Sequence, residues 1–209
     1  MVKGWPSPSL MFCSWGCMLP PATLRELSGI LGRGGVIAYP TETLYGLGAD
    51  PWNDAAVHRI FELKGRSPDK PLPLLLPTGD PERFGIQLTP LARRLGDRYW
   101  PGPVTLIVPA TGFPSIVTAG TDTVAVRRSP LPFVEALLGH WSRPLVTTSA
   151  NLSDQPSAVR GAEVLRAFPR GLDCIVDGGT LTGRAGSTIV DCTGDQPRVV
   201  RQGDVTIEL

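Results

Sequence analysis

From Thr23 onward, stretches with helical periodicity alternate with short apolar runs rich in branched residues. This alternation restricts the chain to folds that mix helices and strands. In the first helical stretch, residues 23–31, the leucines and isoleucine share one face, and Thr23 and Glu26 have the spacing of a capping box. Further helices are expected over residues 54–64, from Pro90 onward, over 130–138 and over 162–168.

The apolar runs predict the strands of one sheet. Helices and strands alternate early in the chain, whereas strands crowd its last forty residues, which favours a mixed sheet over a strictly parallel one. We therefore expect a single α/β domain over residues 21–209, with a twisted sheet of parallel and antiparallel strands flanked by helices, and an N-terminal extension over residues 1–20. The strands are expected at residues 36–39, 72–76, 104–108, 124–126, 145–148, 174–176, 188–190, 199–200 and 205–207.

Charge and composition remove several classes of function. The 20 Lys and Arg nearly balance the 19 Asp and Glu, unlike the composition of a protein that binds nucleic acid through bulk positive charge. Four cysteines without a C-x-x-C pair, and only two histidines, give a zinc site little to be built from. No apolar run reaches the length of a membrane span. We expect a cytoplasmic protein with reduced thiols and no membrane contact.

The common nucleotide and hydrolase motifs are also missing. There is no P-loop, no G-x-G-x-x-G between a strand and a helix, and no G-x-S-x-G elbow. Residues 178–183, GGTLTG, have the glycine spacing of a phosphate loop, but Arg184 follows where a lysine is needed. We interpret this segment as a glycine-rich turn between late strands.

Four polar clusters follow predicted strands or lie in the loops just after them, where α/β sheets usually bind ligands. They are residues 39–50 (YPTETLYGLGAD), 63–76 (LKGRSPDKPLPLLL), 121–130 (TDTVAVRRSP) and 146–158 (VTTSANLSDQPSA). The first suits a loop whose hydroxyls and amides face a small polar ligand, although an irregular turn would explain it equally well.

The second cluster gathers Lys64, Arg66 and Lys70 around a helix end. A cation at a helix C-terminus can simply compensate the dipole, which would explain Lys64 but not Lys70, beyond the turn. Only three of the 20 cations are lysines, so two of them within seven residues favour point charges that meet phosphate oxygens.

These segments resemble the threonylcarbamoyl-AMP synthase (YrdC-like) family. The family pattern K-x-R, followed far downstream by S-x-N, is matched by Lys64-Gly65-Arg66 and Ser149-Ala150-Asn151. The resemblance covers nearly the whole chain. Further matches follow in family order, namely PTETLYGLG, KPL, WPGPVTL, VAVR, TSANLS, STIVDCTG and VVRQGDV.

The resemblance implies an enzyme that joins L-threonine, bicarbonate and ATP, with Mg²⁺ on the ATP phosphates, into threonylcarbamoyl-AMP and pyrophosphate. A separate complex then uses this product to modify tRNA. The implied catalytic residues are Lys64, Arg66, Ser149 and Asn151. The implied ATP-binding residues are Arg66, Lys70, Thr123, Ser149, Ser157 and Arg201. The implied threonine-binding residues are Thr43, Arg127, Thr147 and Ser187, with Arg127 as the partner of the carboxylate.

One departure and two alternatives accompany this resemblance. Leu75 stands where the family often has a histidine, which puts one amino-acid contact in question. The fold is also associated with binding of double-stranded RNA or tRNA on a basic face, where Lys64, Arg66 and Arg201 would serve. The related carbamoyl-adenylate domain of hydrogenase maturation proteins occurs in much longer chains that carry zinc-finger cysteines, which this sequence lacks.

Overall fold

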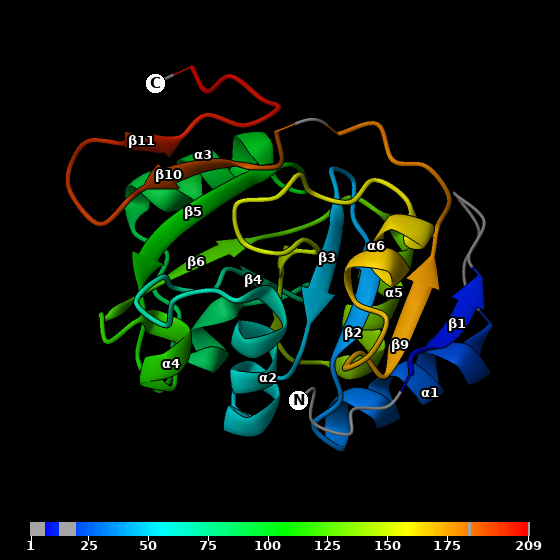
Figure 1. The fold of residues 1–209 in the computed structure, drawn as a ribbon. Helices are drawn as coiled ribbons and strands as arrows, with labels where there is room; N and C mark the ends of the chain where they lie inside the picture. The colour runs from blue at the N-terminus through cyan, green and yellow to red at the C-terminus, as the bar shows by residue number, and fades with distance from the viewer. Residues whose placement is uncertain (1–6, 13–19, 184, 209) are drawn as a thin grey trace.

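The apolar runs form two mixed sheets in the computed structural model, which describes residues 7–12, 20–183 and 185–208 (Figure 1). The five-stranded sheet has the order β1 (Ser9–Phe12), β9 (Cys174–Asp177), β2 (Ile37–Pro40), β3 (Tyr45–Gly48) and β8 (Thr148–Ser149). The six-stranded sheet has the order β11 (Arg198–Arg201), β10 (Thr188–Asp191), β5 (Val104–Pro109), β6 (Thr123–Arg127), β4 (Leu74–Leu75) and β7 (Leu145–Val146). Each sheet contains parallel and antiparallel pairs.

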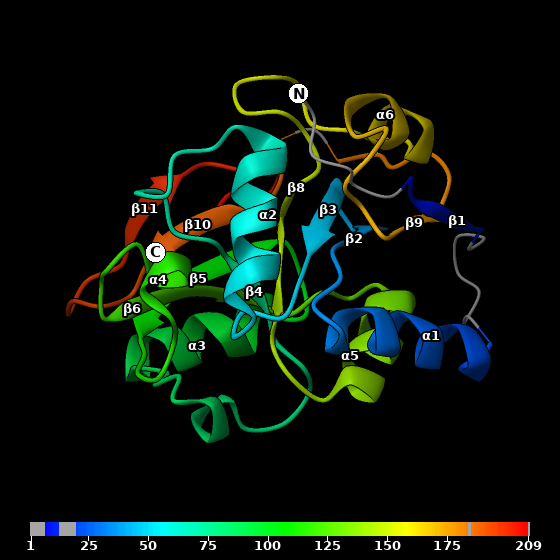
Figure 2. The ribbon, with the colours of Figure 1, turned by 60° about the horizontal axis from the view of Figure 1, so that its bottom comes forward.

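Helices cover these sheets and close two hydrophobic cores. In the smaller core, α1 (Pro21–Gly32) and α5 (Pro132–Trp141) lie side by side against β2 and β9 (Figure 2). The larger core takes apolar residues from α2 (Asp54–Lys64), α3 (Pro90–Tyr99) and α6 (Gly161–Ala167). The short helix α4 (Ser115–Thr118) packs near α2 and β6, and a 3₁₀ turn covers Pro81–Phe84.

The expected mixed α/β class is confirmed, but the strands divide between two sheets instead of forming one. The reason lies in residues 145–149, which were expected to be one strand. Leu145 and Val146 pair with β4 in the six-stranded sheet, whereas Thr148 and Ser149 pair with β3 in the five-stranded sheet. Between them, the backbone N–H of Thr147 donates to the carbonyl of Pro73 at 2.8 Å. The chain therefore passes from one sheet into the other, and the two sheets meet along this segment.

Two local expectations are wrong. Helix α1 begins at Pro21 with Pro20 as its N-cap residue, and no side chain caps it, so Thr23 and Glu26 form no capping box. Residues 205–207 are not a strand, because the carbonyl of Val205 accepts from the side chains of Thr188 and Gln202 instead of a neighbouring strand.

Part of the expected N-terminal extension belongs to the fold. Strand β1 pairs in parallel with β9, and the backbone N–H of Ser9 donates to the carbonyl of Asp173 at 3.1 Å. Residues 1–6 and 13–19, and with them Cys13 and Cys17, lie outside the described residues. None of the helices in the described part of the chain combines the length and the apolar character needed to cross a membrane.

Candidate active site

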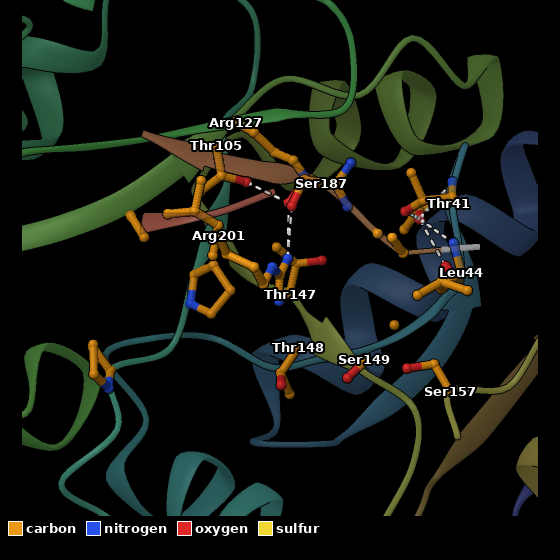
Figure 3. Close-up of a pocket in the computed structure, with 18 of the residues that line it drawn as sticks. Thr41, Leu44, Thr105, Arg127, Thr147, Thr148, Ser149, Ser157, Ser187 and Arg201 are labelled. Carbon is orange, nitrogen blue, oxygen red and sulfur yellow. Dashed lines mark hydrogen bonds between the residues drawn. The ribbon is translucent and has the colours of Figure 1, made fainter. Parts of the chain in front are cut away.

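A cavity of about 390 Å³ lies where the two sheets meet (Figure 3). Side chains alternate between the two faces of a strand, and the residues of β5, β6 and β10 that line this space lie two apart within β5 and within β6. The six-stranded sheet contributes Thr105, Ile107, Ala125, Arg127, Ile189, Val200 and Arg201, and Ser187 lines the cavity just before β10 begins. The five-stranded sheet and the crossing segment contribute Tyr45, Gly46, Thr147, Thr148 and Ser149, and the loops add Thr41, Thr43, Leu44, Arg66, Lys70, Pro71, Pro73, Ser157, Ala185 and Gly186.

Two arginines mark opposite ends of one row across the six-stranded sheet. Arg201 pairs with Ile189, Ile189 pairs with Thr105, and Arg127 is opposite Thr105 in the ladder that pairs Leu106 with Val126. Three steps between neighbouring strands separate the two arginine backbones by about 14 Å, at roughly 4.8 Å a step. The cavity therefore has two cationic ends, although, besides burial, the charge of Arg201 still helps to lower the pKa of Arg127.

The first cationic end combines Arg201 with Arg66 and Lys70. Arg66 follows Gly65, whose left-handed conformation (φ 59°) ends helix α2 and turns the chain toward the cavity. Its guanidinium donates to the carbonyl of Pro71 at 3.0 Å. Burial lowers the pKa of Arg66, and the positive charge of Arg201 lowers it further. The two guanidinium groups thus lie close enough for the charge of one to act on the other.

The second cationic end is Arg127, which is only 6% exposed. Its Nη1 forms an ion pair with Glu42, and Ser129 donates its hydroxyl to the other oxygen of that carboxylate. Burial lowers the pKa of Arg127 to about 10, although the neighbouring Tyr39 opposes this effect. Sequence analysis assigned no role to Glu42, which lies between the cavity-lining residues Thr41 and Thr43 in the PTET segment.

Hydroxyl groups fill much of the wall between these ends. The hydroxyls of Thr105 and Ser187 lie 2.8 Å apart, and those of Thr41 and Thr43 lie 3.2 Å apart. Arg201 donates to the carbonyl of Ser187 at 2.8 Å. Apart from Tyr45, every ionisable side chain in the described lining is a lysine or arginine. The described wall therefore offers positive charge and hydroxyls, but no carboxylate or imidazole that could act as a general base.

The structure brings most of the predicted site residues together. Arg66, Lys70, Ser149, Ser157, Arg201, Thr43, Arg127, Thr147 and Ser187 all line the cavity. Thr123, at the start of β6, does not, and its hydroxyl lies 3.0 Å from that of Thr121. Sequence analysis assigned no role to Thr41, Thr105 and Thr148, although Thr41 and Thr148 lie within two of the four polar clusters.

Lys64 and Asn151 lie behind the wall instead of on it. Lys64 is 3% exposed, and its Nζ donates to the carbonyls of Ser149 and Asn151, the latter at 2.8 Å, and to Oδ1 of Asn151 at 3.4 Å. The backbone N–H of Ser153 donates to the carbonyl of Lys64 at 2.8 Å. Burial, and then the charge of Arg66, lower the pKa of Lys64 to about 7. Lys64 thus holds residues 149–153 in place, whereas the sequence predicted that Lys64 contacts phosphate directly.

The structure also shows where Leu75 and the glycine-rich segment, residues 178–183, lie relative to the cavity. Leu75 is fully buried in the smaller core and does not line the cavity. The glycine-rich segment expected to be a turn packs against the backbone of Thr43, where a Cβ on Gly183 would lie 2.1 Å from the carbonyl oxygen. This close approach brings Ala185 and Gly186 to the cavity.

Comparison with known proteins adds independent information. The model of the Sua5/YciO/YrdC family, described by the words "Telomere recombination", matches residues 29–203. A threonylcarbamoyl-AMP synthase of Pyrococcus abyssi is 37% identical over 187 residues, which are 88% of this chain and 55% of that protein. Another, of Stutzerimonas stutzeri, is 38% identical over 87% of this chain and 95% of that protein.

A solved structure is also similar to this chain, both in fold and in sequence. The crystal structure of P. abyssi Sua5 complexed with L-threonine has a TM-score of 0.87 and 35% identity, and covers 93% of this chain and 57% of that one. The chain therefore spans about half the length of its P. abyssi relative and nearly all of its S. stutzeri relative.

Proposed function

The chain belongs to the Sua5/YciO/YrdC family, and on this basis we propose that it is a threonylcarbamoyl-AMP synthase. It would join L-threonine, bicarbonate and ATP and release pyrophosphate. The observation that carries this proposal is a single cavity with two separate cationic ends and a wall of hydroxyls between them. Two anionic substrates that must react with each other need such a site.

The chemistry requires positioning more than a base. In the proposed reaction the amino group of threonine, after losing a proton to solvent, forms an N–C bond with bicarbonate, and water leaves as the C–O bond breaks. One oxygen of the resulting carbamate attacks the α-phosphorus of ATP. The P–O bond to pyrophosphate breaks, and pyrophosphate leaves with the electron pair. Because both reactants are anions, their mutual repulsion is a large part of the barrier, and fixed cations lower it. A cavity lined by cations without a general base suits this reaction.

The end formed by Arg66, Lys70 and Arg201 suits the nucleotide. Two guanidinium groups and an ammonium would contact the phosphate oxygens, with Ser149 and Ser157 as further hydrogen-bond partners. The described residues contain no group of three or more His, Cys, Asp or Glu side chains that could hold a metal ion. Mg²⁺ would therefore enter with ATP, bound to its phosphates.

The end formed by Arg127 suits the amino acid. A guanidinium can meet both oxygens of a carboxylate, and Thr43, Thr147 and Ser187 supply hydroxyls for the remaining polar groups. The similar P. abyssi structure is complexed with L-threonine, which supports threonine as the amino-acid substrate. We also propose a cytoplasmic enzyme, whose product a separate complex transfers to tRNA.

The test is pyrophosphate release by the purified protein with MgATP, in the presence and absence of L-threonine and of bicarbonate. Release that requires both supports the synthase reaction. No threonine-dependent release, beside a synthase that is active in the same assay, would refute it. Binding of double-stranded RNA with a steep salt dependence and without ATP turnover would then favour the RNA-binding alternative.

A further inference from the structure

The carboxylate of Glu42 is engaged at both of its oxygens, beside the cavity. Oε1 accepts from Nη1 of Arg127, and Oε2 accepts from the hydroxyl of Ser129. That hydroxyl in turn accepts from the backbone N–H of Leu131 at 3.2 Å. A chain of contacts thus connects the residue before helix α5 with the guanidinium at the amino-acid end of the cavity.

These contacts leave Glu42 little freedom. Its side chain is 12% exposed and that of Arg127 is 7% exposed. Two donors on two different oxygens fix the position and the plane of a carboxylate, and the carboxylate then fixes the guanidinium. Arg127 nevertheless lines the cavity. One of its nitrogens is therefore held by the protein while another part of the group faces the space for substrate.

An arginine without this partner would behave differently. A buried guanidinium that loses its anion carries an uncompensated charge, and a long side chain without an anchor samples several rotamers. Either change would move the cation away from the place where a substrate carboxylate has to be met. The nucleotide end has no comparable ion pair among the described residues that line it.

We propose that Glu42 is a positioning residue that holds Arg127 in the orientation needed to bind the carboxylate of the amino-acid substrate. This inference rests on the proposed function, because it assigns the Arg127 end of the cavity to the amino acid. It adds a residue that touches no substrate itself and acts through Arg127 alone, with Ser129 as its support.

The test compares L-threonine binding by calorimetry in the wild type and in two variants. E42A removes both acceptors, so we expect the Kd for L-threonine to rise about tenfold or more, equivalent to at least about 1.4 kcal/mol. E42Q keeps an oxygen for Arg127 and an amide for Ser129 but loses the negative charge, so its Kd should lie between those of the wild type and E42A. The Kd for MgATP, measured separately, should change less than about twofold in both variants, since the hydrogen bonds described for Glu42 join it to Arg127 and Ser129 and not to the nucleotide end.

Asp50 provides a matched control. It is 8% exposed and accepts from Arg143 at 2.8 Å and from the backbone of Trp52 at 3.0 Å, but does not line the cavity. D50A should therefore leave L-threonine binding unchanged. If E42A gives no folded protein, E42D takes its place, because the shorter side chain withdraws the carboxylate while it keeps the charge, and the Kd should again rise.

The outcomes separate this inference from the proposed function. A wild type that binds no L-threonine would overturn both. A wild type that binds L-threonine, with E42A unchanged, would overturn only the role of Glu42. Equal losses of L-threonine and MgATP binding in E42A, or a loss in E42Q as large as in E42A, would also overturn the positioning role.

Discussion

Replacing Lys64 with methionine tests whether this lysine holds the cavity wall or binds substrate itself. Methionine keeps a flexible apolar chain in the same space but removes the ammonium. The carbonyls of Ser149 and Asn151 then lose their donor, while Ser149 remains part of the wall. The substitution therefore acts on the segment 149–153 and leaves the other cations of the cavity in place.

Two opposing contributions to stability can be weighed. Hydrogen bonds from a charged donor contribute about 1.5–3 kcal/mol each, so losing the two carbonyl contacts costs about 3–6 kcal/mol. Against this, burial and the charge of Arg66 lower the pKa of Lys64 from 10.5 to about 7. A difference of that size corresponds to about 5 kcal/mol of unfavourable free energy for the charged form. These contributions nearly cancel, so the free energy of unfolding should change by less than about 2 kcal/mol.

Activity should respond much more strongly than stability. A displacement of the wall by about 1 Å can lower a rate by about 100-fold, so we expect kcat/KM for pyrophosphate release to fall about 30- to 100-fold in Lys64→Met. Hydrogen exchange should show faster exchange at the amides of residues 149–153. Lys70→Met is the control, because Lys70 lines the cavity and makes no contact with this segment in the hydrogen bonds described.

Two results would refute this reasoning. Less than a threefold loss of activity in Lys64→Met would show that the segment needs no anchor. Unchanged hydrogen exchange over residues 149–153, combined with a selective loss of ATP affinity, would show that Lys64 is a phosphate ligand, as the sequence alone indicated.

Three further predictions follow from the described contacts. Arg127→Ala should raise the KM for L-threonine at least about tenfold, and should raise the KM for ATP by less. Arg66→Ala should raise the KM for ATP more than the KM for L-threonine. Equal effects on the two KM values in steady-state kinetics would contradict two separate ends. Because the folded pKa of Lys64 is about 7, below its value of 10.5 in the unfolded chain, the unfolded state binds more protons between these values. The free energy of urea unfolding should therefore rise from pH 7 to pH 10 in the wild type relative to Lys64→Met, and an unchanged difference would mean that Lys64 stays charged. Tyr45→Phe removes a hydroxyl that lies 3.0 Å from Asp177 and should cost about 1–2 kcal/mol, or roughly 2–8 °C in Tm by calorimetry; no change would mean that water replaces the contact.

Sequence periodicity predicted most of the fold, and the failures have identifiable causes. Helices α2 and α3 begin where the sequence signals placed them, with Asn53 and Thr89 as capping residues whose side chains accept from the first turn. Strand β3 lies in a segment expected to be a loop, because its two glycines and its polar neighbours hid the apolar alternation. Strand β1 pairs with β9, far away in the sequence, and local patterns carry no information about such a partner.

The sequence predicted which residues form the candidate site better than it predicted how they are arranged. Polar residues after buried strands, together with the family resemblance, indicated most of the residues that line the cavity. The sequence could not show in which direction each side chain points. Lys64 and Arg66 are two residues apart, yet one points behind the wall and the other into the cavity, because Gly65 ends the helix between them. Likewise, only the folded chain reveals that Glu42 meets Arg127.

The segment from Leu145 to Ser149 belongs to both sheets, and this limits how the cavity can open. The two walls of the cavity cannot swing apart like the lobes of a hinged enzyme unless β7 or β8 gives up its pairing. Movement that keeps both pairings is therefore left to the loops that line the cavity, which include residues 41–44, 66–73, 157 and 185–187. An insertion at Thr147 would separate the two walls permanently, whereas insertions in those loops would change only the entrance.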